Sequence, residues 1–527
     1  MKDETAVMEA IEAIEEQPFL VPEIKLWPRA EQPQAEDGAP TRVKAVLRNQ
    51  RVMRVLDVER LLDADHPARA IWELVGQCDL QPFHREIKAV KGKAGRPSHD
   101  PRLLISLWVY SYTQGIASGR EIEERCGYDP AYIWMAGAEK VCAHTLTDFR
   151  AERGEALKDL SSQILAAMAG EGLVDLQQVT QDGTKINASA GSDTLRRQGT
   201  IEKRVEEARQ RVEQLSKQEE KESKSRRSAA AQRRAAKEQL ERLEKALEAV
   251  KELQKNGKTA EEARVSITDP DARVMKQNNN GYGLSYNAQF TTDAKNTVIV
   301  SVAVTRDGND AGQLEPAIDR LQEEAGRQPE QALADGGYAS RENIVKMEQK
   351  GVDLIAPVPD GKVQKETLYQ IRGVTAEFRP EAFAFDGEKN CYTCPAGKSL
   401  PYRRKNVEPG RTKYIYQAAK EDCRSCASRE QCCRQSRNGR SVQRVEESEE
   451  VKSFRSKMET EEAKAIYRKR GTVAEFPHLW IKEKFGLRRF SLRGLKKVNV
   501  EGMWVAITFN LQQWIRLSWK QRLGQTP

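Results

Sequence analysis

Three acidic residues occupy settings that suit chemistry on phosphates. Asp182 lies in Val-Thr-Gln-Asp-Gly-Thr-Lys-Ile, and Asp335 lies in Ala-Leu-Ala-Asp-Gly-Gly-Tyr. Glu475 ends the stretch Tyr-Arg-Lys-Arg-Gly-Thr-Val-Ala-Glu, and Lys482 follows seven residues later. Two carboxylates at strand ends and a third on a helix can hold two divalent metal ions, which activate water and stabilise the leaving oxygen in phosphodiester cleavage. The triad therefore predicts metal-dependent phosphodiester chemistry.

Strands and helices must bring these acids together. Asp182 is expected near the end of a first strand within 176–190, and Asp335 at the end of a strand over 331–335. Alternating residues around a Thr-Asp-Ala-Lys-Asn turn predict a hairpin. The other expected elements are the hairpin at 283–305, helices at 310–326 and 339–350, a strand at 352–358 and a helical region at 450–522 with Glu475. Without two insertions, this order matches a ribonuclease-H-like mixed sheet flanked by helices, an α/β core over 176–360 and 446–520.

Glycines follow both aspartates. Gly336 and Gly337 permit a tight exit from the strand and leave the Asp335 carboxylate unobstructed, and the same logic applies to Gly183 after Asp182. Any one acid could instead cap a helix or pair with an arginine, but three acids on this strand order favour a site. His478 could lie near the metals, although the helix surface is the commoner place for such a residue.

The first insertion, 194–266, has heptad spacing. Its apolar residues repeat in steps of three and four, which indicates charged helices that pack along a seam. The residues are Val205, Ala208, Val212, Leu215, Leu240, Leu243, Leu247 and Val250. An antiparallel coiled-coil hairpin turning near Ser223–Ser228 is expected. It would act in dimerisation or DNA clamping, or be an inert insertion.

The second insertion, 361–445, is basic and contains six of the nine cysteines. Cys391 and Cys394 form one Cys-x-x-Cys pair, and Cys423 and Cys426 form another. Two such pairs indicate tetrahedral Zn²⁺, possible here as a zinc ribbon. Cys432 and Cys433 leave the ligand set open, and an iron–sulfur cluster or free thiols are the alternatives.

The N-terminal part divides into an acidic arm over 1–45 and a helical segment over 46–175. Residues 1–40 carry ten acidic and three basic side chains, which predicts a flexible arm. Asp100-Pro101 and Asp129-Pro130 are helix starts, Ser118 and Glu121 form a capping box, and the segment from His144 to Arg150 leads into a longer helix that reaches about Ala169. Such short helices suit a DNA-binding domain of the helix-turn-helix kind or a plain packing domain.

Composition sets limits on the function. No apolar run approaches the length that spans a bilayer, and no signal peptide is visible, so a cytoplasmic location without membrane contact is expected. Lysine and arginine concentrate in 398–445 and 482–522, which favours a phosphate-rich partner. The Gly-x-x-x-x-Gly-Lys-Ser/Thr loop is absent, so ATP use is not indicated.

From about residue 50 to 515, the chain resembles a bacterial insertion-sequence transposase of the Asp-Asp-Glu type with an InsH-like N-terminal domain and a cysteine-bearing insertion. Asp182-Gly-Thr-Lys-Ile, Ala334-Asp-Gly-Gly-Tyr, His144-Thr-Leu-Thr-Asp-Phe-Arg and Gly486-Leu-Arg-Arg-Phe-Ser-Leu-Arg-Gly carry the resemblance. The family's Tyr-Arg-Glu-Lys signature falls on Tyr467, Arg470, Glu475 and Lys482. Four residues, in place of the family's three, separate Arg470 from Glu475, which puts the role of Arg470 in doubt.

The resemblance implies a DNA transposase. Asp182, Asp335 and Glu475 would bind Mg²⁺ or Mn²⁺ and cut the transposon ends, and the free 3′-OH would join target DNA. Contacts to double-stranded DNA would come from Tyr467, Arg470, Lys482, Arg489 and Arg493. A homodimer on DNA and a nucleoid-associated bacterial location are also implied. The alternatives are a nuclease of the same fold that never joins strands, and a catalytically silent DNA-binding descendant.

Overall fold

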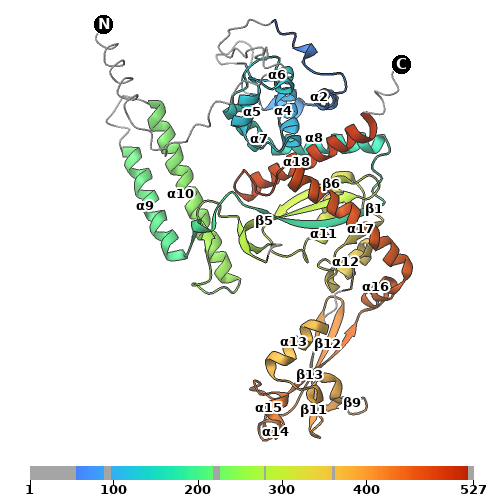
Figure 1. Cartoon of the computed structure of the whole chain (residues 1–527). Coiled ribbons are helices and arrows are strands. Elements are labelled where there is room, and N and C mark those ends of the chain that lie inside the picture. Colours follow the sequence, from blue (N-terminus) through green and yellow to red (C-terminus); the bar gives the residue numbers. More distant parts are fainter. Residues whose placement is uncertain are drawn as a thin grey trace, which may run out of the picture. The chain divides into compact units, whose positions relative to one another are not determined.

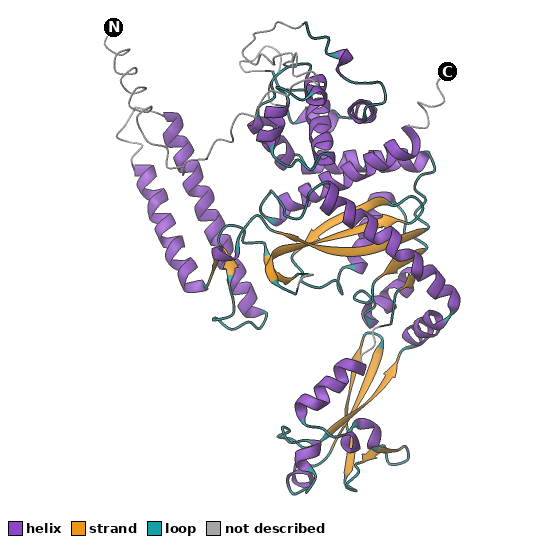
Figure 2. Cartoon of the chain, viewed as in Figure 1, coloured by secondary structure: helices purple, strands orange, loops and turns teal. Residues whose placement is uncertain are grey.

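A computed structural model gives the fold of most of the chain (Figures 1 and 2). The described residues are 55–87, 89, 97–217, 226–277, 280–358 and 362–519. The predicted acidic arm, 1–45, lies outside them. Within these residues, none of the helices combines the length and the apolar character that crossing a bilayer requires.

Helices, four of them with side-chain caps, make up the N-terminal part. They are η1 (Glu59–Leu61), α2 (Pro67–Gly76), α3 (Gln81–Arg85), α4 (Pro101–Thr113), α5 (Gly119–Arg125), α6 (Pro130–Ala136), α7 (Ala143–Glu152) and α8 (Gly154–Gly170). Asp100 and Asp129 accept backbone N–H bonds at the starts of α4 and α6, and Ser118 accepts one from Glu121 in α5. The three predicted helix starts are confirmed. The segment from His144 to Ala169 is two helices, divided at Arg153.

A mixed sheet lies at the centre of the chain. Its strands are β1 (Gln178–Asn187), β4 (Arg273–Lys276), β5 (Tyr282–Asp293), β6 (Val298–Thr305), β7 (Gln331–Ala334) and β8 (Asp353–Ile355). The spatial order is β4-β5-β1-β7-β8, and β6 also pairs with β5. β1 is antiparallel to β5 and parallel to β7, and β7 is parallel to β8. The predicted hairpin is confirmed as β5 and β6, whereas the short strand β4 was not predicted.

Helices from the second half of the chain pack on this sheet. They are α11 (Leu314–Ala325), α12 (Arg341–Lys350), α16 (Glu449–Glu459), α17 (Glu461–Leu479) and α18 (Leu495–Trp514), followed by η7 (Ile515–Trp519). α17 contacts β1, β5, β7 and β8. α18 contacts β6 and also α4, α7 and α8, so the N-terminal helices and the sheet share one apolar core.

Two asparagines of α18 close the outer edge of β6. Asn510 accepts from the Ile299 N–H at 2.9 Å and donates to the Ile299 carbonyl at 2.7 Å. Asn499 makes the same pair of bonds with Val304, at 2.8 and 2.9 Å. Each side-chain amide thus takes the place of a neighbouring strand's peptide group on a buried edge.

The first insertion is a pair of packed helices. α9 (Gln198–Lys217) and α10 (Arg226–Lys255) lie side by side, and β2 (Leu195–Arg196) pairs with β3 (Val265–Ser266) after η2 (Ser192–Thr194) (Figure 1). Val205, Ala208, Leu243 and Val250 are buried in their common core, as the heptad spacing predicts. Half of the predicted turn, 223–225, lies outside the described residues, and its other half, 226–228, already belongs to α10.

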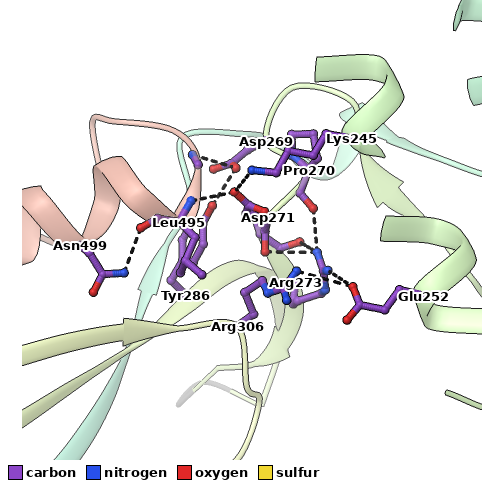
Figure 3. A network of polar contacts seen from close by, with 12 residues as sticks. Lys245, Glu252, Asp269, Pro270, Asp271, Arg273, Tyr286, Arg306, Leu495 and Asn499 are labelled. Carbon is purple, nitrogen blue, oxygen red and sulfur yellow. Dashed lines mark hydrogen bonds and ion pairs between the residues drawn. The ribbon is translucent and has the colours of Figure 1, made fainter. Parts of the chain in front are cut away.

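Two aspartates anchor the end of this insertion to α18. Asp271 accepts from Lys245 of α10 at 2.6 Å and from the Leu495 N–H at 2.8 Å (Figure 3). Asp269 accepts from the Tyr286 hydroxyl at 2.7 Å and from the Gly494 N–H at 3.1 Å. Because these N–H groups have no partner within the helix, the two carboxylates cap α18 from another segment.

The second insertion has a sheet and a core of its own. The strands, in the order β13-β12-β11-β10-β9, are β9 (Ala384–Asp386), β10 (Cys391–Thr393), β11 (Ser399–Glu408), β12 (Arg411–Gln417) and β13 (Ser441–Glu447). The helices are α13 (Lys362–Arg372), η4 (Ala376–Phe378), η5 (Pro380–Ala382), α14 (Lys420–Arg424) and α15 (Arg429–Cys432). Phe378, Leu400, Tyr416 and Val442 lie in the core.

Candidate active site

Asp182 and Asp335 are the first residues after the parallel pairing of β1 with β7 ends. The last paired residues of these parallel strands are Gln181 and Ala334, which immediately precede the two aspartates. β7 ends there, while β1 continues to Asn187 along β5. The expectation that Asp182 lies near the end of its strand is therefore wrong, since it is the fifth of ten residues in β1. It lies instead where the parallel pairing of β1 ends.

Glu475 reaches the same place from α17. It lines a cavity of about 1040 Å³ together with Asp182 and Asp310. The cationic side chains that line this cavity are Lys185, Lys276, Arg468 and Lys482. Asp335 is not among the lining residues, but it is close enough to raise the pKa of Asp182. The arrangement combines acidic groups with cations that can bind phosphate.

Asp182 is buried against two side chains of α17. Its Oδ2 lies 3.2 Å from Arg470 and 3.6 Å from Nδ1 of His478. The side chains of Asp182, Arg470 and His478 are 17%, 12% and 15% exposed. Burial raises the pKa of Asp182 to about 6, and Arg470 only partly offsets this effect. A partly buried carboxylate with a raised pKa is stabilised in its charged form by any further cation that enters the cavity.

His478 is a buried residue of the site, not the surface residue that was thought commoner. Its ring packs on Phe290 with centroids 5.4 Å apart. Burial first, and then Lys482 and Arg470, lower the pKa of His478 to about 3, so the imidazole is neutral. Since His478 follows Glu475 by three residues, both lie on one face of α17.

The other predicted DNA contacts lie in different surroundings. Lys482, in the π-helical turn η6 (Trp480–Lys484), lines the cavity, and burial together with Arg488 lowers its pKa. Tyr467 packs against the main core and does not line the cavity. Despite the extra residue before Glu475, Arg470 still reaches Asp182.

Arg489 and Arg493 belong to a segment that extends along the end of β1. The Asn187 N–H donates to the Arg488 carbonyl at 3.1 Å, and the Phe490 N–H donates to the Asn187 carbonyl at 2.9 Å. Arg489 forms a bridge with Asn187 and is exposed, and Arg493 donates to the Ser189 carbonyl at 2.9 Å. β1 thus links Asp182 to these exposed guanidinium groups.

A group of buried polar side chains on β1 and β5, close to the acids, was not predicted from the sequence. Gln181 of β1 and Asn287, Gln289 and Thr291 of β5 are buried, and Asp310 bonds to two of them. Alternating polar residues in a strand that is otherwise apolar were the available signal. A Cβ on Gly183 would lie 2.2 Å from Gln289 Nε2 and 2.7 Å from Asp310 Oδ1. Gly183 therefore makes room for this group and does not provide a strand exit.

The acidic side chains have the chemistry that a divalent metal ion prefers. Carboxylate oxygens are the usual ligands of Mg²⁺, and Asp182 lacks full charge compensation in the cavity. Among the described residues, however, no three histidine, cysteine or acidic side chains are arranged as a finished metal site. Arg470 occupies one side of Asp182, so a metal at Oδ2 would have to displace the Arg470 guanidinium.

The cysteines of the second insertion cluster differently from the two predicted pairs. Five of them line one small cavity: Cys394, Cys423, Cys426, Cys432 and Cys433. Cys391 is not among them. The Lys398 and Arg440 N–H groups donate to the sulfurs of Cys394 and Cys423 at 3.2 Å each. A Zn²⁺ site formed by Cys391, Cys394, Cys423 and Cys426 stays a prediction.

Comparisons with known proteins identify two transposase families. Residues 393–515 match the family described as "Transposase DDE domain", and residues 56–152 match "Transposase domain (DUF772)". The first match includes Glu475 but neither aspartate. No curated protein matches the chain. One solved structure, a piggyBac transposase synaptic complex with hairpin DNA, is 8% identical over 87% of this chain and 76% of that chain. Its TM-score of 0.30 is too low to establish a shared fold. The two family matches, one in the N-terminal helices and one that includes Glu475, together support an insertion-sequence transposase of the Asp-Asp-Glu type.

Proposed function

We propose that the chain cuts DNA at the ends of its insertion sequence and joins them to target DNA, with Asp182, Asp335 and Glu475 as the catalytic residues. One observation carries this proposal: the two aspartates leave the β1–β7 ladder side by side, and Glu475 lines the same cavity as Asp182. The strand order β6-β5-β1-β7-β8, with α17 packed across it, supports a ribonuclease-H-like core.

The three carboxylates would hold Mg²⁺ or Mn²⁺. Bound metal would supply an activated water and stabilise the departing 3′ oxygen. In the first step, water adds to a phosphorus atom at the transposon end and the bond from phosphorus to the 3′ oxygen breaks. In the second, the freed 3′-OH attacks a target phosphodiester and releases a 3′-OH of the target.

The cations around the acids would position the DNA. Lys482 lines the cavity and would contact a phosphate close to the cut. Arg470 would exchange its contact with Asp182 for a phosphate when metal and DNA bind. Arg489 and Arg493, exposed along the continuation of β1, would contact the flanking duplex. Tyr467, packed in the core, would support α17. Binding both transposon ends would require a homodimer.

Substitution of one acid tests this assignment. Asp335→Ala should abolish Mg²⁺-dependent cleavage of a duplex made from the DNA that flanks the gene, while DNA binding is retained. Asp319→Asn is a matched control, because Asp319 is an acid paired with Lys350 on the outside of α11. Cleavage by Asp335→Ala at the wild-type rate would refute the site.

A second measurement separates transposition from simple cutting. A pre-cleaved end with a free 3′-OH is incubated with wild-type protein, Mg²⁺ and a supercoiled plasmid. Joined product supports strand transfer. Cleavage of the uncut duplex without any joining would identify a nuclease, and binding without cleavage would identify a silent DNA-binding protein.

A further inference from the structure

Asp310 is a carboxylate of the cavity to which the proposed mechanism gives no role. It lies between β6 and α11, and it lines the cavity with Asp182 and Glu475. Its Oδ1 accepts from Asn287 Nδ2 at 2.6 Å and from Gln289 Nε2 at 2.7 Å. The Lys185 ammonium lies 3.4 Å from the same oxygen. Three donors therefore fix the position of this carboxylate.

The same bonds connect Asp310 to the segments that carry both catalytic aspartates. Gln289 Oε1 accepts from the Tyr338 hydroxyl at 2.5 Å and from Gln181 Nε2 at 2.8 Å. Gln181 immediately precedes Asp182, and Tyr338 ends the Asp-Gly-Gly-Tyr motif. Asp310 is thus part of one polar network that joins β1, β5 and the turn after β7.

Lys185 is the charged group that Asp310 holds. It follows Asp182 by three residues on β1, it lines the cavity, and its side chain is 14% exposed. A long lysine side chain is flexible, and its ammonium is a compact point charge that binds phosphate. An ion pair at the base of the cavity restricts where that ammonium can lie.

A carboxylate at this place opposes DNA binding. It adds negative charge to a cavity that must accept phosphates, and it raises the pKa of the neighbouring Asp182. Its negative charge argues against a direct contact with DNA phosphate, and its bonds favour a contribution through the groups that it positions.

We propose that Asp310 is a positioning residue that holds the Lys185 ammonium in the cavity that Asp182 lines, where Lys185 contacts the phosphate that is cut. The inference rests on the proposed function, because it places Lys185 at the scissile phosphate. It adds to that function a phosphate contact and a carboxylate outside the Asp-Asp-Glu triad.

Four variants test the inference in the full chain. Asp310→Asn keeps an acceptor for Asn287 and Gln289 but removes the charge that pairs with Lys185. Lys185→Met removes the ammonium and keeps the side chain's bulk, and the third variant combines both changes. Asp307→Asn is the matched control, because Asp307 is exposed in the same loop and accepts from Gln313 at 2.7 Å.

Two readouts are taken for each variant with a labelled duplex made from the DNA that flanks the gene. The first is the single-turnover cleavage rate in Mg²⁺. The second is the affinity for the uncut duplex at several salt concentrations, without Mg²⁺. Loss of one lysine–phosphate contact makes the dependence of log K on log salt shallower by about one. A residue that only supports the fold would not change this slope selectively.

We expect Asp310→Asn to slow cleavage without weakening DNA binding. Its cleavage should be about 10- to 100-fold slower, the range for a misplaced group in an active site. Its affinity should equal or exceed that of the wild type. Lys185→Met should cleave as slowly and show the shallower slope. The double variant should be no slower than Lys185→Met alone, because the two residues act as one unit. Asp307→Asn should match the wild type.

Three results would overturn the inference: wild-type cleavage by Asp310→Asn, losses that multiply in the double variant, or an unchanged salt slope in Lys185→Met. A wild-type protein that binds the duplex without cutting it would refute the proposed function instead. The salt slopes would then still decide whether Lys185 touches phosphate.

Discussion

Two glycines that follow the proposed catalytic aspartates should respond differently to the same substitution. In Gly183→Ala, the new methyl group would lie 2.2 Å from Gln289 Nε2 and 2.7 Å from Asp310 Oδ1. Neither atom can move freely, because Gln289 is buried and donates to Asp310 at 2.7 Å. In Gly336→Ala, the nearest atom is the Pro357 carbonyl oxygen at 3.5 Å, an ordinary contact.

The expected loss of stability follows from what the methyl group displaces. Overpacking a buried site costs about 1–3 kcal/mol, and losing a hydrogen bond to a charged group costs about 1.5–3 kcal/mol. Replacing glycine by alanine restricts the unfolded chain and returns about 0.4–1 kcal/mol where the backbone is unstrained. Gly183→Ala should therefore lower the free energy of unfolding by about 2–5 kcal/mol on these figures. Gly336→Ala should change it by less than about 1 kcal/mol.

Urea unfolding followed by circular dichroism compares the two variants with the wild type. Hydrogen–deuterium exchange then shows where the loss lies, and the peptides that cover β1 and β5 should lose protection in Gly183→Ala only. Equal midpoints for Gly183→Ala and the wild type would refute the packing argument. Equal losses in both variants would also contradict it, because a methyl group on Gly336 meets only ordinary contacts.

Two more substitutions test how α18 is held in place. Asn510→Leu removes both bonds to Ile299 of β6, and the two buried backbone groups left unpaired should cost about 1–3 kcal/mol each in unfolding free energy. Gln512→Leu is the control, because the Gln512 side chain bonds to Trp480 and not to β6. An equal loss of stability in both variants would contradict this account. Asp271→Asn weakens the cap on α18 and the ion pair with Lys245. Although burial of Asp271 acts in the opposite direction, Lys245 and the Leu495 N–H lower the pKa of this carboxyl group. The stability that the charge contributes should therefore be present at neutral pH and disappear as the pH falls below the usual aspartate range. A stability difference between Asp271→Asn and the wild type that persists unchanged in acid would refute that prediction.

Local signals in the sequence predicted the local structure well. Asp100-Pro101 and Asp129-Pro130 specify helix starts because the side chain and the proline both favour the first turn, and the structure has helices there. The β5–β6 hairpin followed from alternation around a turn, and the buried seam of α9 and α10 followed from heptad spacing. These patterns depend on neighbouring residues only.

Features that depend on distant residues were predicted poorly. Asp310 lies in Asp-Gly-Asn-Asp, which looks like an ordinary polar loop until β5 places Asn287 and Gln289 beside it. The role of Gly183 was misjudged for the same reason, since the atoms that exclude a side chain come from other segments. His478 was expected on a surface because its spacing alone could not show which face of α17 meets the sheet.

The last described helices also determine when the N-terminal part can finish folding. Trp504 of α18 donates to the Arg150 carbonyl, 354 residues earlier, and Trp519 donates to Glu73. At ribosomal rates of about 5–20 residues per second, roughly 20–90 s separate the synthesis of these partners. Until α18 emerges, the faces of α4, α7 and α8 that it covers remain open to water. The N-terminal helices can therefore complete their packing only after α18 has been translated, so this part of the chain and the segment with Glu475 become folded together in each new molecule.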